Sequence, residues 1–428
     1  MGGVVLTQAA HIRLDLFSAA VFGALAILAF AATKQRAALG LVLLIVSDPF
    51  DYARYVGWTT VTVPKIVLIG VALGLLARRV SLAPLRRSEI RALLGGAIAI
   101  AVVTIATVIP GTYIDAVGRE SLKALEYLAT FAIATIAFAH DPDERPAWYA
   151  LAGVTAIVCA SALVQEFTVA PAGMMLAGHV VPRIAGLLEG PNQLAGFFDI
   201  ACPLLLARGI ARGGAVYLAA FALAVVTDVL TFSRGGLFAL AVGTFFVALR
   251  TSNPTVRRAL GVGGAVAALA IAAALVKLHL FARFLSVSDV DTASGLGSRG
   301  ALWSAAIGFW RAHPILGIGA GNFELELPDA GLAGVRTHAN SLYLQTLAEG
   351  GVLLFAATVF TLGAAIRTFY VRAPKEALFV GIGAATIALA THQLLDFLTF
   401  FPKIGVLWWT WLGIASGALV SRAPQDAA

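Results

Sequence analysis

Three arginines and one histidine lie next to the ends of apolar segments, and their chemistry suits the transfer of a phosphorylated group. Arg234 lies in TFSRGG, Arg299 in GLGSRGALW and Arg183 in VPRIAGLLEG, while His338 opens the run THANSLYLQTLAEGG. Arginine carries a permanent charge on a planar fork that binds phosphate oxygens through paired hydrogen bonds. Histidine accepts a proton near neutral pH. The four residues predict a site in which the arginines bind a diphosphate and His338 deprotonates an incoming hydroxyl.

Further polar residues lie near His338 along the chain or on the same side of the membrane. Asn340 and Tyr343 occupy other faces of the helix that begins near His338, and both are candidates to bind sugar hydroxyls. Asp396, in THQLLDFLTFFPK, is interpreted as the partner of one arginine rather than as a catalyst. Glu349 shares the helical face of His338 but lies about 16 Å further along at 1.5 Å per residue, which is too far for contact.

The composition indicates that these residues belong to a helical membrane protein. Of the 428 residues, 60% are hydrophobic and only 12% are charged, whereas about 25% of the residues in a soluble protein are charged. Apolar runs of about 20 residues, long enough to cross a bilayer, recur from end to end. The short alternating segments of an outer-membrane barrel are absent from the sequence. The predicted fold class is therefore an all-α polytopic membrane protein.

Thirteen apolar segments are predicted to form helices. They are 14–32, 37–52, 62–77, 92–110, 121–139, 147–165, 192–208, 213–231, 236–250, 259–277, 341–366, 377–395 and 404–420. Segment 37–52 departs most from the pattern because SDPF interrupts it. The first segment is long enough to remain as a span rather than to be cleaved as a signal peptide.

The charges of the loops predict the orientation of the chain. The positive-inside rule places the arginine-rich loops in the cytoplasm, and these are 78–91, 208–212, 250–258 and 367–375. The opposite side then receives the loops 111–120, 166–191, 232–235, 278–340 and 396–403. A cytoplasmic N-terminus follows only if segments 14–32 and 37–52 together make one crossing. We favour this arrangement, which gives about twelve transmembrane helices.

All four candidate site residues fall on the non-cytoplasmic side. Each has a structural alternative, because an arginine at a helix end commonly reaches for lipid headgroups and a lone histidine commonly makes structural hydrogen bonds. The loops on this side are otherwise poor in basic residues, so the exceptions favour a shared function. The net charge of +7 is explained by the cytoplasmic loops, and no nucleic acid is predicted as a partner.

The longest predicted loop divides the chain into three regions. We expect a transmembrane helix bundle over residues 1–277, a non-cytoplasmic loop over 278–340, and further transmembrane helices over 341–428. A non-cytoplasmic loop of this length is usually functional rather than a simple connection.

Within this loop, SRGALWSAAIGFWRAHP (298–314) predicts a helix. It begins at a serine N-cap, Ser298, and ends before a proline. One face of the helix carries Trp303, Ala306, Ile307 and Trp310. Aromatic residues of this kind favour the membrane interface, so the helix is predicted to lie on the bilayer surface.

Several common site motifs are absent from the sequence. There is no GxxxxGK[ST] loop, no HExxH, and no carboxylate cluster of the kind that binds a divalent metal. Cys159 and Cys202 lie in apolar runs and indicate neither a disulfide nor a metal site. GIGAGN (317–322) has the wrong spacing for a dinucleotide fingerprint and is expected to form a turn. The sequence predicts neither a metal nor a cofactor. Without a metal, the negative charge of a diphosphate leaving group must be stabilised by arginines.

The segments around these residues resemble the O-antigen ligase and polymerase superfamily. SRGALWSAAIGFWRAHPILGIGAGNFE (298–324), followed by THANSLYLQTLAEGGVLLF (337–355), is similar to that family's pattern. The pattern has an arginine-bearing segment, HPxxGxGxGNF, a variable stretch, and then His-x-Asn with a Gly-Gly further on. TFSRGG resembles the arginine turn upstream in the same family. The resemblance covers roughly residues 180 to 400 in detail and the whole chain in architecture.

The resemblance implies a bacterial inner-membrane glycosyltransferase with a GT-C-type helical fold, a periplasmic active site and no metal. It implies an undecaprenyl-diphosphate-linked glycan as donor and a sugar hydroxyl of lipid A–core as acceptor, with inversion at the anomeric carbon. His338 is then the base that activates the acceptor hydroxyl, and Arg234 and Arg299 bind the diphosphate. Arg183 and Asn192 are further matches to the family. The remaining partners are membrane lipids, and the non-cytoplasmic side becomes the periplasm.

Other functions stay open at this point. The superfamily also contains O-antigen polymerases, and protein O-oligosaccharyltransferases that tend to carry an additional C-terminal region. Outside enzymes, a lipid-glycan transporter predicts basic residues at mid-membrane depth and on both sides, whereas these arginines gather at one interface. A binding or structural membrane protein does not need a histidine beside a diphosphate clamp. The O-antigen ligase is the leading hypothesis.

Overall fold

The computed structural model describes residues 15–50, 52–56, 59–168, 173–176, 179–212, 214–251, 254 and 299–422. The predicted apolar segment 259–277 lies outside these residues. So do the first part of the predicted loop, as far as residue 298, and the predicted N-cap Ser298.

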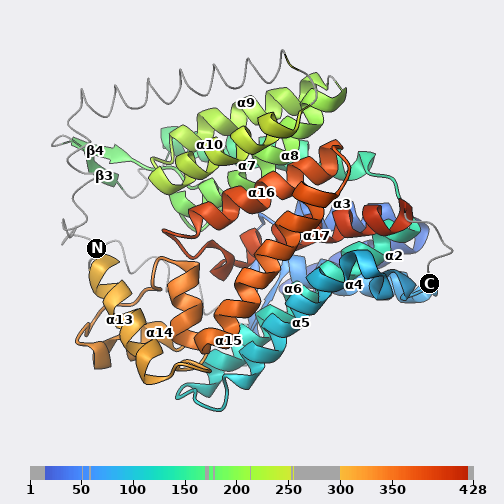
Figure 1. Cartoon of the computed structure of the whole chain (residues 1–428). Helices are drawn as coiled ribbons and strands as arrows, with labels where there is room; N and C mark the ends of the chain where they lie inside the picture. Colours follow the sequence, from blue (N-terminus) through green and yellow to red (C-terminus); the bar gives the residue numbers. More distant parts are fainter. Residues whose placement is uncertain are drawn as a thin grey trace.

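Helices make up most of the described chain (Figure 1). The α-helices are α2 (Leu16–Gln35), α3 (Ala37–Ser47), α4 (Val63–Ala77), α5 (Arg91–Ala106), α6 (Ile114–His140), α7 (Arg145–Thr168), α8 (Pro191–Arg212), α9 (Ala215–Val229), α10 (Arg234–Arg250), α13 (Arg299–Ala312), α14 (Phe323–Glu326), α15 (Leu342–Ala365), α16 (Ala377–His392) and α17 (Pro402–Arg422). The shorter elements are the 3-10 helices η2 (Ala83–Arg86), η3 (Ser88–Ile90), η4 (Leu327–Ala330) and η6 (Leu398–Phe400), and the π-helical segment η5 (Ile366–Arg372). Two antiparallel hairpins are formed by β1 (Ala53–Val56) with β2 (Thr59–Thr62), and by β3 (Gly173–Leu176) with β4 (His179–Pro182).

The helical prediction is confirmed, although the two hairpins are not expected from the sequence pattern. Each of the twelve predicted apolar segments within the described residues contains a helix. Seven helices of the described chain are long and apolar enough to cross a membrane: α2, α5 with η3, α6, α7, α8, α15 with η5, and α17. Four further apolar helices, α3, α4, α9 and α16, are shorter. The chain is a multi-pass helical membrane protein.

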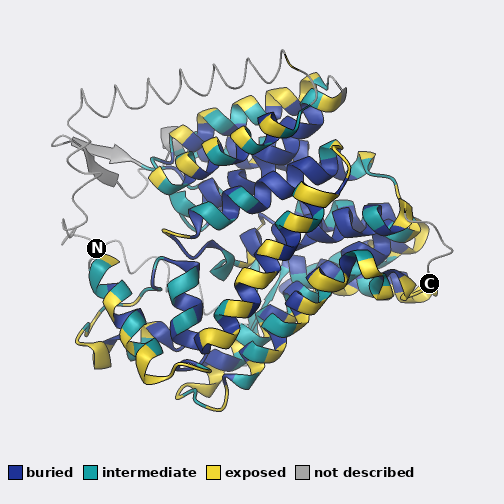
Figure 2. Cartoon of the chain, in the orientation of Figure 1, coloured by how far each residue is buried: buried dark blue, intermediate teal, exposed yellow. Residues whose placement is uncertain are grey.

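The helices form two groups, and α17 joins them (Figure 1). In one group α8 packs on α9, α10 and α16, and in the other α2 packs on α4 while α5 packs on α6 and α15. α17 lies along α6 and also contacts α8. The most apolar stretches of α8 and α17 are 89% and 83% buried within the protein, against 22% for α2 (Figure 2). α8 and α17 therefore form the centre of the molecule, and α2 lies at its edge.

Small residues let α17 approach α6 closely. A Cβ atom at Gly413 would lie 2.5 Å from the Cβ of Ala134, and one at Gly417 would lie 2.6 Å from the carbonyl oxygen of Thr135. Helices in membranes associate through such close contacts because lipid tails supply no hydrophobic driving force between them. The two glycines, four residues apart, therefore set the distance between α6 and α17.

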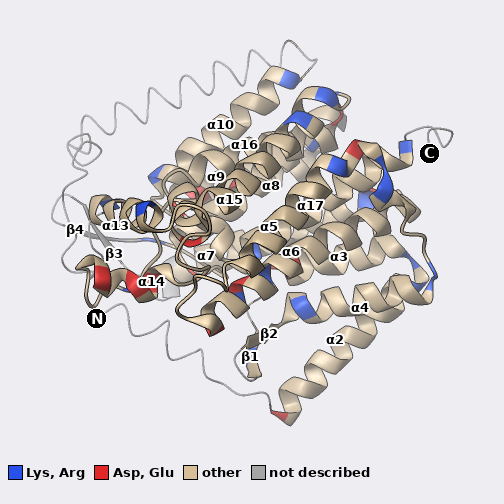
Figure 3. Ribbon diagram, turned by 60° about the horizontal axis from the view of Figure 1, so that its bottom comes forward, with Lys and Arg blue, Asp and Glu red and all other residues tan. Residues whose placement is uncertain are grey.

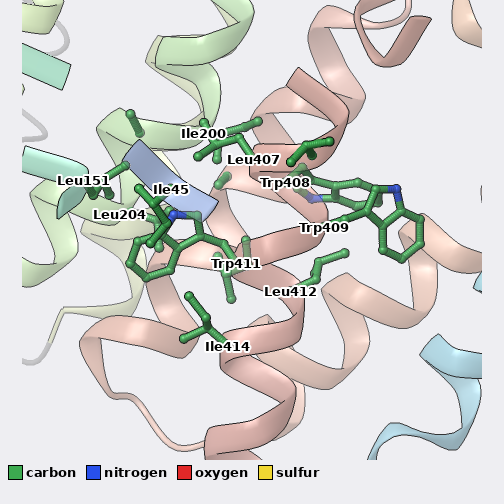
Figure 4. Packing of buried hydrophobic residues seen from close by; sticks show 14 of the residues in the cluster. Ile45, Leu151, Ile200, Leu204, Leu407, Trp408, Trp409, Trp411, Leu412 and Ile414 are labelled. Carbon is green, nitrogen blue, oxygen red and sulfur yellow. The ribbon is translucent and has the colours of Figure 1, made fainter. Parts of the chain in front are cut away.

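Trp411 fills the core beside this contact. Its ring centroid lies 4.9 Å from that of Trp148 on α7, and both side chains are fully buried. Figure 4 shows Ile45 of α3, Leu151 of α7 and Leu204 of α8 near the same ring. One tryptophan of α17 thus packs against α7, against α8 of the first group, and against α3, which contacts α2 and α4 of the second group.

The arginine-rich loops meet at one end of the helices, which we call the basic end (Figure 3). Side-chain hydrogen bonds and ion pairs connect these loops: Arg36 with Asp141 and Asp143, Arg78 with the carbonyls of Lys34 and Gln35, Arg208 with Glu144, Arg250 with the carbonyl of Ala373, and Arg422 with Glu376. The charges that predict a shared side for these loops therefore do lie together. Their assignment to the cytoplasm stays a prediction.

Segments 14–32 and 37–52 do not make one crossing, and this prediction is wrong. Extended backbone at Arg36 (φ −146°, ψ 127°) turns the chain back between α2 and α3. A Cβ atom at Gly40 would lie 2.4 Å from the hydroxyl of Thr33, so the two helices lie side by side near the turn instead of end to end. α2 and α4 both end at the basic end, and α2 therefore begins at the opposite end of the molecule.

Candidate functional site

The arginine turn TFSRGG joins α9 to α10 at the end opposite the basic end. The Ser233 side chain caps α10 by accepting a hydrogen bond from the N–H of Gly236 (3.3 Å), and the Thr231 hydroxyl accepts one from the N–H of Ser233 (3.0 Å). Arg234 is the first residue of α10 and is exposed. The N-terminus of a helix carries partial positive charge and favours anions. Arg234 adds a full charge to a position that already suits a phosphate.

Arg183 is bound within the protein. Its Nε donates to the carbonyl oxygen of Thr231 (2.8 Å), and its Nη2 donates to Oδ1 of Asn192 (2.9 Å). Asn192 in turn donates through Nδ2 to Oδ2 of Asp396 (2.7 Å). These hydrogen bonds join the arginine turn, the start of α8 and the segment after α16. Asp396, predicted as the partner of an arginine, reaches Arg183 through Asn192.

His338 faces Asp396 across a gap. The Nε2 atom lies 4.0 Å from Oδ1 of Asp396, and the side chains of the two residues are 16% and 3% exposed. The imidazole is surrounded by the rings of Phe397, Phe400 and Phe401, at centroid distances of 5.9, 5.9 and 6.1 Å. Asp396 also accepts a hydrogen bond from the N–H of Phe397 (2.7 Å). The imidazole thus lies among aromatic rings, and His338 is the more exposed member of the pair.

Asn340 determines which ring nitrogen of His338 carries the proton. Its backbone N–H donates to Nδ1 of His338 (3.1 Å), and its φ of 50° is a left-handed value that asparagine tolerates. In the neutral ring the proton therefore lies on Nε2, facing Asp396. Tyr343, the other predicted sugar-binding residue, donates its hydroxyl proton to the carbonyl of Ala390 (2.9 Å) and so ties α15 to α16.

Two residues that are not predicted as site residues hold the backbone next to His338. The side-chain oxygen of Gln345 accepts a hydrogen bond from the N–H of Ala339 (2.6 Å), and its Nε2 donates to Oε1 of Glu349 (2.8 Å). The same glutamate oxygen accepts from the N–H of Phe323 (3.2 Å). Glu349 does not bond with His338, as expected from its distance. It connects the two halves of the motif, GIGAGNF and THAN.

GIGAGN forms a turn, as predicted, against a break in α15. The N–H groups of Ile318 and Gly319 donate to the carbonyls of Ala348 and Glu349, at 2.9 and 3.0 Å. Gly351 interrupts α15 with a φ of 60°, in the left-handed region that glycine adopts without strain. The Gly-Gly of the motif therefore makes the break into which the glycine-rich turn packs.

Arg299 begins α13, which confirms the predicted helix over 298–314 in its described part. Trp303, one turn further on, donates through Nε1 to the carbonyl of Ala339 (3.0 Å), directly after His338. α13 is thereby attached to the His338 segment, and Arg299 is exposed. The location of helix α13 on the bilayer surface stays a prediction.

The charges of the site act on one another. Burial lowers the pKa of Arg183, and the nearby charges of Arg234 and Arg299 also lower it, whereas Asp396 raises it. Burial likewise lowers the pKa of His338; Asp396 raises it, and Arg299 lowers it. The structure therefore brings the predicted residues into one region. Three arginines and one aspartate leave two positive charges, a balance that suits a diphosphate.

Lys123 is a further charged residue near His338 that the sequence analysis does not single out. Its Nζ pairs with Glu120 (2.7 Å), donates to the carbonyl of Phe400 (3.0 Å) and lies 4.2 Å from the centroid of the Phe400 ring. The positive charge also lowers the pKa of His338. The only signal in the sequence is a lysine one helical turn after a glutamate, a common surface pattern.

A cavity of about 120 Å³ lies between α5, α6, α15 and α17, behind this part of the site. Its walls are mostly apolar, with Lys123, Glu349, Gln393 and Phe397 among the lining residues. Phe397 lines the cavity and also contacts the ring of His338. Within the described part of the chain, no group of three or more His, Cys, Asp or Glu side chains is placed to hold a metal ion.

A comparison with protein families shows which family the segment around these residues resembles. Residues 219–359 match the family model described as O-antigen ligase. The matched range covers about a third of the chain and contains the arginine turn, α13, the GIGAGN turn and His338. The resemblance to the O-antigen ligase superfamily is confirmed, and this family works on lipid-linked glycans in a membrane. A comparison with curated proteins gives no match.

Arg183, Asn192 and Asp396 lie outside the matched range of the O-antigen ligase family. The hydrogen bonds described above nevertheless attach Arg183 to the arginine turn and connect it through Asn192 to Asp396, which lies 4.0 Å from His338. The site is therefore built from the matched segment together with α8 and the segment that follows α16.

Proposed function

We propose that this protein is an O-antigen ligase of the bacterial inner membrane. It transfers a glycan from undecaprenyl diphosphate to a sugar hydroxyl of lipid A–core in lipopolysaccharide biosynthesis. The observation that carries the proposal is the grouping of three arginines around the His338–Asp396 pair, within and next to the segment that matches the family. Transfer from a diphosphate needs groups that bind its charge and a group that takes up a proton, and this arrangement contains both.

The two exposed arginines bind the donor diphosphate in this proposal. Arg234 offers its guanidinium at the N-terminus of α10, and Arg299 offers another from α13. Arg183 is hydrogen-bonded to Thr231 and Asn192, so it holds the arginine turn in place and adds its positive charge to the site without contacting the diphosphate. Together they stabilise the negative charge that a metal ion stabilises in other diphosphate-using enzymes.

In the transfer step, the acceptor oxygen forms a bond to the anomeric carbon of the donor sugar. The bond from that carbon to the diphosphate oxygen breaks, and its electron pair leaves with the diphosphate. The arginines stabilise the charge that develops there. The acceptor attacks from the face opposite the diphosphate, so the anomeric configuration inverts. The proton of the acceptor hydroxyl passes to the His338–Asp396 pair.

His338 and Asp396 act as one unit in taking up this proton. The ring accepts it at Nδ1 by giving up the hydrogen bond from Asn340, or the Asp396 carboxylate accepts it while Nε2–H orients the hydroxyl. Both routes need the two side chains side by side. Because the pKa of His338 is lowered, the ring is neutral at neutral pH, which is the state that either route requires.

The orientation of the site follows from the loop charges. The basic end faces the cytoplasm under the positive-inside rule, and the arginine turn and His338 then face the periplasm. The donor diphosphate lies at the level of the lipid headgroups on that side. The acceptor hydroxyl meets it there, beside His338.

The test is transfer by purified protein in lipid nanodiscs, supplied with undecaprenyl-diphosphate-linked glycan, lipid A–core and EDTA. Wild type is compared with His338→Ala and with His140→Ala. His140 is a matched control because it is an exposed histidine at the basic end, bonded to Ser81 and Ile136. We expect glycan on lipid A–core with wild type and His140→Ala. His338→Ala should lose roughly 10²- to 10⁴-fold of the rate, the usual contribution of acid–base catalysis.

Other outcomes point to other functions. Longer chains that remain on the carrier lipid mean an O-antigen polymerase, and glycan on a protein acceptor means a protein O-oligosaccharyltransferase. No new linkage in the nanodiscs, together with movement of the donor across the bilayer of sealed proteoliposomes, means a lipid-glycan transporter. Near-normal transfer by His338→Ala refutes the role given to His338.

A further inference from the structure

We infer that a buried histidine–aspartate pair, His392–Asp199, positions the arginine turn against the donor diphosphate. The inference rests on the proposed function of Arg234 and adds positioning residues to that site. Neither residue lies in the segment that matches the family.

The pair is closed off from solvent. Nδ1 of His392, the last residue of α16, lies 2.6 Å from Oδ2 of Asp199 on α8, and their side chains are 2% and 0% exposed. A hydrogen bond to a carboxylate in such surroundings is short and strong. It fixes the rotation of the imidazole, and it leaves no room for a substrate group between the two atoms.

The fixed ring lies against the first turn of α10. A Cβ atom at Gly235 would lie 2.8 Å from Cδ2 and 2.9 Å from Nε2 of His392. One at Gly236 would lie 3.3 Å from Cε1 of the same ring and 2.4 Å from the Cβ of Ala195 on α8. Any larger residue at these positions displaces the turn or the ring. The two glycines that follow Arg234 in the sequence are therefore explained by contact with His392 and α8.

The arginine turn is held from two sides. On the loop side, Arg183 binds the carbonyl of Thr231, and the Thr231 hydroxyl binds the N–H of Ser233. On the helix side, the ring of His392 supports Gly235 and Gly236. Arg234 lies between these supports with its backbone fixed and its side chain exposed. Preorganisation of this kind lowers the cost of binding an anion.

A packing role alone does not account for the pair. A leucine or phenylalanine fills the same volume without the cost of burying a carboxylate, and replacing a buried ion pair with apolar residues is often stabilising. The pair supplies what an apolar side chain lacks, which is a fixed ring orientation. We connect that orientation with the position of Arg234.

The test measures binding of undecaprenyl diphosphate itself to the full-length protein in nanodiscs. Gly235→Ala disturbs the contact between the arginine turn and the His392 ring but leaves the His392–Asp199 pair in place. Alanine favours a helix more than glycine does, so the main expected effect of this variant is the collision of its Cβ atom with the ring. Asp199→Asn/His392→Ser removes the ring without leaving an unpaired buried carboxylate. Gly95→Ala is the matched control, because a Cβ atom at this helical glycine of α5 meets nothing within 4 Å. Arg234→Ala is the reference for loss of an arginine of the diphosphate clamp, by which we mean Arg234 and Arg299.

We expect Gly235→Ala and the double variant each to weaken binding about tenfold, as expected for one misplaced charge-assisted contact. In the double background, Gly235→Ala should cause no further loss, because the ring it collides with is gone. In transfer assays the donor KM rises and the acceptor KM is unchanged. A merely structural defect lowers the amount of active enzyme, and so lowers kcat with both KM values unchanged.

The outcomes separate this inference from the proposed function. If Arg234→Ala weakens binding while Gly235→Ala and the double variant keep wild-type affinity and donor KM, the positioning role is overturned and the clamp stands. If Arg234→Ala binds as wild type does, the clamp itself is wrong, and this inference falls with it. If the double variant does not fold, Gly235→Ala against Gly95→Ala decides the question.

Discussion

The two histidine–aspartate pairs of this protein use the same residue types in opposite ways. His338 and Asp396 lie 4.0 Å apart, and His338 is part-exposed. His392 and Asp199 lie 2.6 Å apart, and both are buried. We call His338–Asp396 the open pair and His392–Asp199 the closed pair. The open pair has access for a substrate group, whereas the closed pair has none. Separation and access, more than residue type, are therefore the basis for proposing a chemical role for one pair and a positioning role for the other.

One short segment carries a member of each pair. His392 ends α16, and Asp396 follows four residues later. The N–H of Leu342, at the start of α15, donates to the carbonyls of both Gln393 and Asp396 (3.0 Å each). The segment is thus anchored to the helix that follows His338. A displacement of the closed pair is expected to move Asp396 of the open pair through this segment.

The largest difference between the pairs should appear in stability. His392→Ala leaves the carboxylate of Asp199 buried without its partner, which costs on the order of 3–5 kcal/mol in the free energy of unfolding. His338→Ala removes a ring that is 4.0 Å from its partner. It leaves Asp396 its hydrogen bonds from Asn192 and from the N–H of Phe397, so it should cost less than His392→Ala. Denaturant unfolding of the two variants in the same detergent measures both values. Equal losses would mean that the closed pair contributes no more to the fold than the open one.

A smaller effect should separate the exposed arginines from the buried one. Arg234→Lys and Arg299→Lys keep the charge but lose the planar fork, and should raise the donor KM about tenfold with the acceptor KM unchanged. Arg183→Lys loses one of two protein hydrogen bonds, so it should lower the melting temperature as well. Steady-state kinetics with each substrate varied in turn, and thermal unfolding, measure the two effects. Wild-type kinetics for Arg234→Lys would show that a point charge is enough.

The open pair and its arginines are largely predictable from the sequence. Arg234 and Arg299 appear as basic residues on a side that is poor in them, and His338 appears as a polar residue at the start of an apolar run. Such residues are conspicuous because charge is costly near a membrane. Asp396 is recognised as a partner, although the structure shows that Asn192 stands between it and Arg183.

The closed pair and the supports of His338 are not predictable in the same way. Asp199 and His392 are 193 positions apart. Asp199 is a lone charged residue in an apolar segment and His392 lies in the polar run THQ, so nothing local indicates that they meet. Gln345 and Glu349 read as one polar stripe on a helix, and their link to Phe323 depends on the turn before α14. The turn at Arg36 is missed for another reason. A hydropathy pattern measures the length of an apolar run but does not record the direction in which the chain continues.

The smallest expected effect, on pH dependence, tests the open pair directly. Burial lowers the pKa of His338 below its ordinary value of 6.5, and the ring must be neutral to take part in proton uptake. Activity should therefore persist below pH 6.5 and fall only as the pH drops through the lowered pKa. Asp396 raises this pKa, so Asp396→Asn should move the acid limb to lower pH; Arg299 lowers it, so Arg299→Ala should move the limb upward. Profiles of kcat/KM from about pH 5 to pH 8, each scaled to its own plateau, measure the shifts. Opposite shifts identify His338 as the titrating group, and an acid limb that neither variant moves assigns it to a different residue.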